Sequence, residues 1–258
     1  MTDFAGVAGT KSWSTGVSIA DINADGFLDI YVSNSGDIKG DNKQNELYIN
    51  NGDLTFTEMA ADYGLDDTGY STHAAFFDYD RDGDLDCYLL NNSYKGGFRI
   101  TNIGTNQRPI RDSVGGDKLF RNDDGYFNDV SEESGIYGSV IGFGLGVTVG
   151  DVNNDGWMDI YVSNDFFERD YLYINNADGT FSEELEYQIK SISAASMGAD
   201  MADINNDGYS EIFVTDMLPE PDERIKTVTT FDNWDRHQYI KTSGYWNQFT
   251  RNTLQLNN

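Results

Sequence analysis

The stretch that decides the fold is Asp21-Ile-Asn23-Ala-Asp25-Gly26-Phe-Leu-Asp29, an acidic loop that the chain contains four times. The other copies are Asp78-Tyr-Asp80-Arg-Asp82-Gly83-Asp-Leu-Asp86, Asp151-Val-Asn153-Asn-Asp155-Gly156-Trp-Met-Asp159 and Asp203-Ile-Asn205-Asn-Asp207-Gly208-Tyr-Ser-Glu211. Oxygen-bearing side chains at positions 1, 3, 5 and 9 suit a hard cation that takes six to eight oxygen ligands. The glycine at position 6 permits a sharp turn, after which position 7 can offer its carbonyl oxygen. The repeated loop therefore predicts four calcium sites.

The predicted ligands are positions 1, 3, 5, 7 and 9 of each loop. They are Asp21, Asn23, Asp25, Phe27 and Asp29; Asp78, Asp80, Asp82, Asp84 and Asp86; Asp151, Asn153, Asp155, Trp157 and Asp159; and Asp203, Asn205, Asp207, Tyr209 and Glu211. A helix–loop–helix calcium sensor needs a glutamate at position 12 of its loop. That position is apolar in every copy, where it holds Val32, Leu89, Val162 and Val214. The sequence therefore disfavours the helical-sensor interpretation.

Short β-branched and aromatic runs flank each loop and predict strands, so that each loop closes a β-hairpin. A second hairpin signal follows three of the loops, where an Asn-Gly or Asp-Gly pair separates strand-like runs such as 46–51 and 55–58. The first aspartates of successive loops lie 57, 73 and 52 residues apart. Four strands in each repeat of this length predict propeller blades rather than a solenoid. We therefore expect an all-β fold, a β-propeller built from four-stranded antiparallel blades.

The repeats organise residues 1–258 into a single propeller segment. We expect four blades at about 13–60, 70–131, 142–184 and 195–258, with insertions at about 93–116 and 216–250. The last blade stops before its second turn, which predicts fifteen blade strands in place of sixteen.

The N-terminal stretch Asp3-Phe4-Ala-Gly-Val7 resembles the start of a fourth strand, such as Thr55-Phe56-Thr-Glu-Met59. Two outcomes follow from this resemblance. Either the stretch completes the last blade and closes a four-bladed ring, or the chain is part of a longer propeller. The second outcome is favoured, because propellers have 4–8 blades and four is the tightest closure.

The composition excludes several kinds of partner. The net charge at pH 7 is −27, and fourteen of the 44 acidic residues lie in the four loops. This surplus argues against nucleic acid and anionic membrane surfaces as partners. No stretch has the length of a membrane span, and the N-terminus lacks the basic start and apolar core of a signal peptide. The one cysteine, Cys87, is interpreted as a small buried hydrophobe rather than a reactive thiol.

The loops, together with Phe143-Gly144-Leu-Gly146 ahead of the third one, resemble the FG-GAP/VCBS repeats of integrin-α-type β-propellers. The hairpin Asn175-Asn-Ala-Asp-Gly-Thr-Phe181 is more similar still to bacterial VCBS-repeat proteins related to cartilage acidic protein. The resemblance implies a seven- or eight-bladed propeller, an extracellular or cell-surface location, and a role in adhesion or in glycan or protein binding. It also implies calcium ligands at positions 1, 3, 5 and 9 of each loop.

All three prolines fall in the two insertions, and loops on a rigid scaffold often carry binding sites. The candidate ligand-binding residues in these insertions are Arg99, Arg108, Trp234, Arg236, Tyr245 and Trp246. Aromatic faces beside cationic groups suit sugar rings or a protein epitope. The alternative is that these aromatic side chains pack the insertions onto the blades, since large aromatic side chains are usually buried.

We assign no catalytic residue, because the sequence shows no catalytic constellation. Its two histidines, His73 and His237, have no visible partner, and the carboxylate pairs belong to the loops. The expected function is therefore a calcium-stabilised, non-catalytic propeller that binds a glycan or a protein in adhesion. One alternative is a propeller-borne polysaccharide lyase or hydrolase, and another is a structural segment of a multidomain surface protein.

Overall fold

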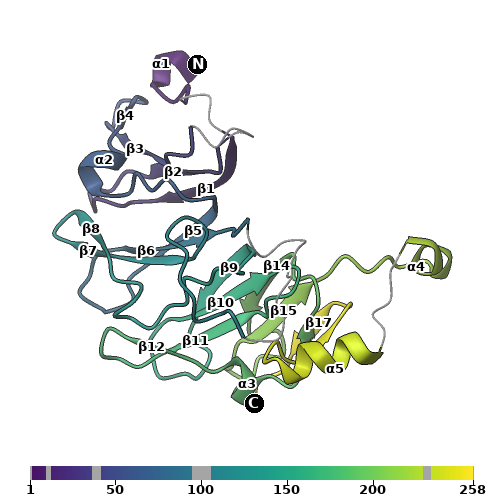
Figure 1. Cartoon of the computed structure of the whole chain (residues 1–258). Coiled ribbons are helices and arrows are strands. Elements are labelled where there is room, and N and C mark those ends of the chain that lie inside the picture. The colour runs from purple at the N-terminus through teal and green to yellow at the C-terminus, as the bar shows by residue number, and fades with distance from the viewer. Residues whose placement is uncertain (1, 10–12, 37–41, 95–105, 229–233, 258) are drawn as a thin grey trace.

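In the described part of the chain, four β-sheets of three or four strands follow one another along an open arc (Figure 1). This computed structural model describes residues 2–9, 13–36, 42–94, 106–228 and 234–257. The first sheet contains β1 (Ser14–Ala20), β2 (Asp29–Asn34), β3 (Glu46–Asn50) and β4 (Phe56–Glu58). The second contains β5 (Ser71–Phe77), β6 (Asp86–Asn91), β7 (Lys118–Asp123) and β8 (Tyr126–Asp129). The third contains β9 (Gly144–Gly150), β10 (Asp159–Asn164), β11 (Tyr171–Asn175) and β12 (Phe181–Glu183).

The fourth sheet has three strands among the described residues, β14 (Gly198–Ala202), β15 (Glu211–Thr215) and β17 (Thr253–Gln255). A short parallel pair, β13 (Ile192–Ser193) with β16 (Gln248–Phe249), lies beside it. Every pair within the four sheets is antiparallel and joins neighbouring strands of a blade. The predicted fold of antiparallel blades is therefore confirmed.

Apolar cores between facing sheets hold consecutive blades together. Tyr31 of the first blade shares a buried cluster with Cys87 and Leu89 of the second blade. Side chains alternate between the two faces of a strand, so the intervening Tyr88 faces the third blade and shares the next cluster with Ile160. Each inner blade is thus apolar on both faces. Cys87 is fully buried, as the sequence predicts.

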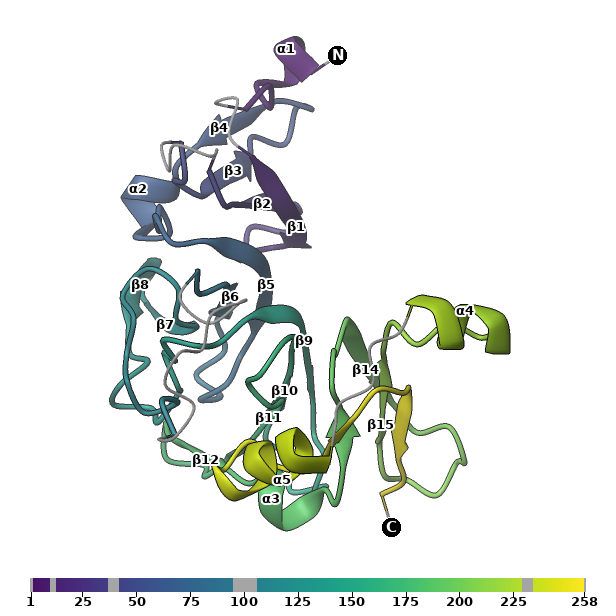
Figure 2. The same ribbon diagram turned by 45° about the vertical axis from the view of Figure 1, so that its right-hand side comes forward.

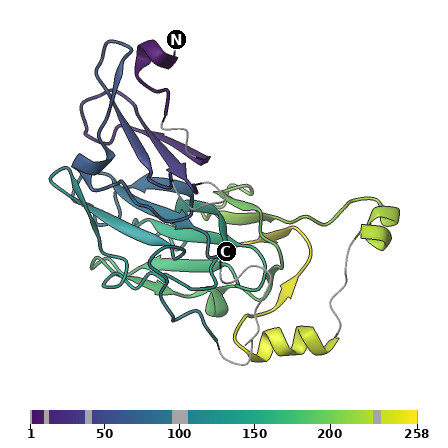
Figure 3. The ribbon, with the colours of Figure 1, turned by 45° about the horizontal axis from the view of Figure 1, so that its top comes forward.

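The helices are short and lie at the ends of strands or in the second insertion. They are α1 (Thr2–Ala5), α2 (Ala60–Tyr63), α3 (Leu185–Gln188), α4 (Asp222–Val228) and α5 (Trp234–Thr242). Helix α4 projects away from the sheets (Figure 3). Every helix in the described part of the chain is too short or too polar to span a lipid bilayer.

The N-terminal stretch is a helical turn, so its interpretation as a fourth strand is wrong. Gly6, after α1, has φ +78°, and a Cβ there would lie 2.7 Å from the carbonyl oxygen of Phe56 in β4. Gly64, after α2, has φ +75°, and a Cβ there would also lie 2.7 Å from a carbonyl oxygen, that of Phe127 in β8. Helix α1 therefore packs on the first blade as α2 packs on the second. The described chain remains an open arc, with α1 and β17 at opposite ends (Figure 2).

The antiparallel order of each blade separates two ends of the arc. The acidic loops join the first and second strands of each blade, so they lie at the same end as the turns between the third and fourth strands. The predicted insertion at 93–116 joins β6 to β7, and the predicted insertion at 216–250 lies between β15 and β17. Both insertions therefore emerge at the opposite end, which we call the insertion end.

Candidate metal centres in the blade hairpins

The acidic loops share one pattern of hydrogen bonds, which the third loop shows in full. The Asp151 carboxylate accepts the backbone N–H groups of Asp155 (3.1 Å) and Gly156 (2.8 Å). The Asp155 carboxylate in turn accepts the N–H of Trp157 (2.8 Å). The same bonds recur in the first and fourth loops. The carboxylates at positions 1 and 5 are thus fixed by hydrogen bonds to the loop's own backbone.

The loop backbone turns through the left-handed region twice. In the third loop Asn154 has φ +59° and Gly156 has φ +88°, and the other three loops have positive φ at the same two positions. Only glycine adopts the conformation at position 6 without strain, although a Cβ there has open space in three of the loops. The glycine is therefore required by the turn rather than by a close neighbour.

The carboxylate at position 9 ties each of the first three loops to the third strand of its blade. Asp159 is fully buried and accepts the N–H groups of Val152 and Asn175, both at 2.8 Å. Asp29 and Asp86 make the equivalent pairs of bonds, and Glu211 accepts the N–H of position 2 in its own loop. In these three blades the buried carboxylate therefore fixes the position of the third strand relative to the first hairpin.

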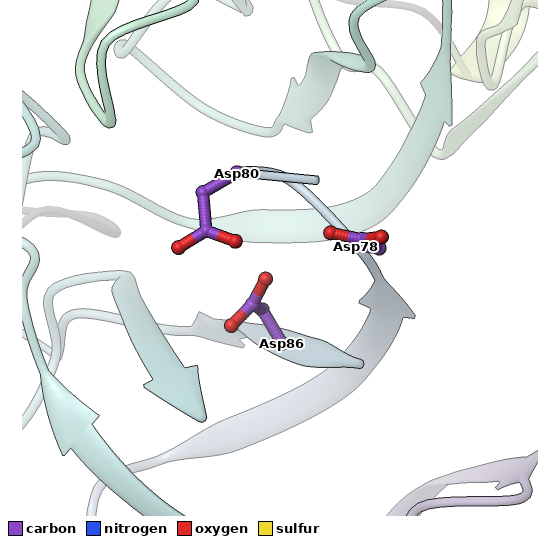
Figure 4. A group of neighbouring side chains, drawn as sticks. All are labelled: Asp78, Asp80 and Asp86. Carbon is purple, nitrogen blue, oxygen red and sulfur yellow. The ribbon is translucent and has the colours of Figure 1, made fainter. Parts of the chain in front are cut away.

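The second loop brings the most carboxylate oxygens together. Asp78, Asp80 and Asp86 each offer an oxygen within 4.8 Å of the others, and Figure 4 shows Asp80 facing Asp86 with Asp78 beside them. Burial raises the pKa of Asp86 to about 7 and, with the neighbouring Asp82, that of Asp84 to about 6. Among the described residues, one oxygen of Asp78 and one of Asp84 are buried without a hydrogen-bond partner.

This donor set fits a divalent cation. Carboxylate oxygens that are crowded, buried and partly unpaired have their charge opposed by burial and by one another, and a bound cation would relieve both effects. In the first, third and fourth loops an asparagine at position 3 donates to the carboxylate at position 5, at 2.8–2.9 Å. The predicted position-7 ligands Phe27, Trp157 and Tyr209 have no side-chain donor group suited to calcium, so only their carbonyl oxygens could serve.

Neighbouring loops also contact one another. The Arg81 guanidinium lies over the Trp157 ring at 4.8 Å, which links the second loop to the third. Asn154 donates to the carbonyl oxygen of Gly208 at 2.7 Å, which links the third loop to the fourth. A cavity of about 460 Å³ lies between the first and second loops and is lined by Asp21 and Asp84 among others. The four candidate centres thus form a row along one end of the arc.

A second repeated polar group, which the loop pattern does not predict, lies at the insertion end. Asp117 accepts hydrogen bonds from the Tyr88 hydroxyl (3.1 Å) and the Asn91 N–H (2.9 Å). Asp170 makes the same two kinds of bond in the third blade, and Asn45 replaces the aspartate in the first. Burial raises the pKa of Asp117 to about 7 and that of Asp170 to about 6. The available signal was an Asp or Asn two residues before the leucine of each third strand.

The predicted ligand-binding residues do not gather at one exposed site. Arg108 is buried, pairs with Glu168 at 2.6 Å and donates to the Gly244 carbonyl at 2.9 Å. Tyr245 is fully buried, and the Trp246 indole N–H donates to a backbone carbonyl at 2.8 Å. Arg108 and Tyr245 thus join the two insertions to each other and to the third blade. Arg99 and the side chain of Arg236 lie outside the described residues.

Trp234 is the exception, since 71% of it is exposed. Its ring lies 6.0 Å from that of His237, which lies 5.3 Å from that of Phe249. The Arg251 guanidinium covers Phe249 at 5.3 Å. We call these four residues the aromatic row. His73, by contrast, lies within β5, where burial lowers its pKa and keeps its ring neutral at pH 7.

Comparison with known proteins places this geometry in a family. The FG-GAP-like repeat matches residues 33–89, 110–162 and 151–214, and the FG-GAP repeat matches residues 13–49. Over 99 residues the chain is 30% identical to integrin alpha-3 of Mus musculus and of Cricetulus griseus, a match that covers 33% of this chain and 9% of each integrin.

Among solved structures, the chain is similar to an Agrocybe aegerita lectin described as recognising non-reducing terminal N-acetylglucosamine. The TM-score is 0.48 at 18% sequence identity, over 82% of this chain and 50% of the lectin chain. The chain therefore spans only a small part of the integrins and half of the lectin. Because the repeat matches cover more than half of its residues and fall on its blades, the chain belongs to the FG-GAP repeat family of β-propeller proteins.

Proposed function

We propose that this chain is a non-catalytic binding propeller whose blades are stabilised by four calcium ions, and that it acts in adhesion outside the cell. The observation that carries the proposal is the repeated acidic loop at the first hairpin of each blade, whose carboxylate at position 1 accepts the glycine N–H in all four copies and whose carboxylate oxygens cluster in the second copy. The similarity to integrin alpha-3 supports an extracellular setting, where calcium is abundant enough for weak sites.

Calcium has a structural role in this proposal. A bound ion supplies positive charge and accepts oxygen ligands from positions 1, 3, 5 and 9. Because the net charge is −27, repulsion among crowded carboxylates opposes the folded state, and a bound cation would reduce this repulsion. An ion that binds only the folded chain stabilises it by mass action. We therefore expect chelation to lower the Tm, and an unchanged melting curve in excess EGTA would contradict the calcium part of the proposal.

The insertion end is the proposed ligand surface. It presents the aromatic row, in which exposed rings lie beside a cationic side chain. Stacked rings with an adjacent guanidinium suit the apolar face of a sugar or the side chains of a protein epitope. The buried Arg108 pairs with Glu168 and donates to the Gly244 carbonyl, which joins the two insertions to each other.

A glycan array and a panel of extracellular matrix proteins would test the binding function. We expect the chain to bind at least one glycan or protein on these arrays when calcium is present. We expect Trp234→Ala to weaken that binding at least tenfold. Tyr126→Ala is the matched control, because Tyr126 is half exposed at the opposite end of the arc. Equal loss in both variants, or no ligand on either array, would contradict a binding surface at the aromatic row.

A further inference from the structure

The residue at position 4 of each acidic loop has a left-handed backbone conformation. The φ angles at this position are +57° for Ala24, +63° for Arg81, +59° for Asn154 and +61° for Asn206. Position 4 is not one of the predicted calcium ligands, which are positions 1, 3, 5, 7 and 9. Its side chain is therefore available for other contacts, and in the second and third loops it contacts the next loop along the arc.

Arg81 joins the second loop to the third. Its guanidinium carbon lies 4.8 Å from the centroid of the Trp157 ring. A Cβ at Gly156 would lie 3.0 Å from an Arg81 nitrogen, so the guanidinium also packs against the backbone of the turn. Trp157 occupies position 7, whose carbonyl oxygen is a predicted ligand, and its N–H donates to the Asp155 carboxylate at 2.8 Å. Arg81 thus contacts the part of the third loop that holds two predicted ligands.

Asn154 joins the third loop to the fourth. Its side-chain amide donates to the carbonyl oxygen of Gly208 at 2.7 Å. That carbonyl belongs to the same peptide group as the N–H of Tyr209, which donates to the Asp207 carboxylate at 2.9 Å. The N–H of Gly208 itself donates to the Asp203 carboxylate at 2.9 Å. Asn154 thus contacts the turn whose N–H groups hold the carboxylates of positions 1 and 5.

The first and second loops are not joined in this way. Position 4 of the first loop is Ala24, which is too short to reach its neighbour, and position 7 of the second loop is Asp84 in place of an aromatic residue. Both residues line the cavity of about 460 Å³ between these two loops. The place that Arg81 and Trp157 occupy between the second and third loops is therefore open here.

A contact between two loops couples their calcium affinities if it is stronger when the loops are loaded than when they are empty. In an empty loop the crowded carboxylates repel one another, whereas a bound cation would hold positions 5 and 7 in one arrangement. The contact of Arg81 with Trp157 at position 7 would then be better ordered. Such coupling is reciprocal, so each loop of a pair would raise the affinity of the other by the same factor.

We propose that Arg81 and Asn154 couple the calcium affinities of the second, third and fourth loops, whereas the first loop binds calcium independently. This inference rests on the calcium sites of the proposed function. Arg81 and Asn154 are positioning residues in it, because neither is a predicted ligand and each acts through the next loop. The three coupled loops would fill over a narrower range of calcium concentration than independent sites, so their blades would gain or lose calcium together.

A calcium titration followed by amide proton–nitrogen correlation spectra tests the coupling loop by loop. The position-6 glycines report on each site, because their N–H groups donate to the position-1 carboxylates; they are Gly26, Gly83, Gly156 and Gly208. Asp155→Ala removes a ligand of the third loop. We expect it to raise the calcium midpoints at Gly83 and Gly208 about two- to tenfold, the effect of losing one exposed cation–π contact or one hydrogen bond. The midpoint at Gly26 should stay unchanged.

Two further variants assign the coupling to the two side chains, and each serves as the control for the other. Arg81→Ala should abolish the rise at Gly83 that Asp155→Ala causes and leave the rise at Gly208, and Asn154→Ala should do the reverse. Both side chains are exposed, and Ala24 already has this backbone conformation, so both variants should fold. Measuring the effect of Asp155→Ala within each background excludes the direct effect of the Arg81 charge on calcium affinity.

Three outcomes would overturn the coupling. One is an equal rise at Gly83 with and without Arg81, and another is unchanged midpoints at Gly83 and Gly208 in Asp155→Ala. The third is a rise at Gly26 of the same size, since the loops would then influence one another without these contacts. Calcium that moves the signal of no loop glycine would refute the calcium sites of the proposed function, and the coupling with them.

Discussion

Asp159→Ala should destabilise the chain even when calcium is absent, whereas Asp155→Ala should do so only when calcium is present. Asp159 is fully buried, and each of its oxygens accepts one backbone N–H. A buried donor left without a partner costs about 1–3 kcal/mol, so losing two costs about 2–6 kcal/mol. In a chain of this size about 1 kcal/mol shifts the Tm by roughly 2–4 °C. The expected fall in Tm in EGTA is therefore about 4–24 °C.

Asp155 is exposed and accepts the N–H of Trp157 at 2.8 Å, so its loss in EGTA should cost no more than about 0.5 kcal/mol. In 10 mM calcium, a site with a Kd of about 10⁻⁴–10⁻³ M contributes about 1.4–2.7 kcal/mol to the folded state. Asp155→Ala should remove that contribution for one site. Glu132→Ala, which removes an exposed acid outside the loops, should change neither measurement.

Differential scanning fluorimetry of the three variants, in EGTA and in 10 mM calcium, provides the comparison. An equal Tm for Asp159→Ala and the wild type in EGTA would refute this prediction, because the two hydrogen bonds to backbone N–H groups would then contribute nothing to the free energy of unfolding. An equal fall in Tm for Asp155→Ala in EGTA and in calcium would also refute it, since Asp155 would then stabilise the chain without a bound metal.

Two further predictions concern sites away from the metal loops. Asp117 has a folded-state pKa of about 7, raised by burial, so the folded chain keeps a proton that the unfolded chain loses near pH 4. The free energy of unfolding should therefore fall as the pH rises from about 4 to 7. Asp117→Asn should reduce that fall by up to about 4 kcal/mol, as measured by urea titrations at constant calcium. Asn45 already fills this position in the first blade, so a variant that fails to fold, or an unchanged pH profile, would refute the assignment. Gly135→Ala should cost about 1–3 kcal/mol, because φ is +79° and the new Cβ would lie 2.7 Å from the Phe181 carbonyl. Gly179→Ala shares the positive φ but meets open space, so an equal loss in both variants would exclude the clash.

The parts of the structure that could be predicted are those set by short-range spacing. The bonds from Asp151 to Asp155 and Gly156 lie within one loop, so the spacing of the residue types is enough to infer the turn. The strands on either side follow from β-branched and aromatic runs. Because four copies share this local pattern, the blades could be counted from the sequence.

The features that escaped prediction depend on partners far apart in the sequence. Asp117 meets Tyr88 across 29 residues, and Arg108 meets Glu168 across 60. No spacing rule marks such pairs, so the sequence predicts a ligand-binding role for Arg108 although its charge is paired with Glu168 and buried. The N-terminal stretch illustrates the other limit, since its Asp-Phe pair imitates a strand while Gly6 ends a helical turn.

A crystal structure of the chain grown in 10 mM calcium tests the central claim most directly. We predict one strong density peak in each of the four loops, coordinated by the side chains of positions 1, 3, 5 and 9 and by the carbonyl oxygen of position 7. Well-ordered loops that hold only water at that calcium concentration would contradict the account.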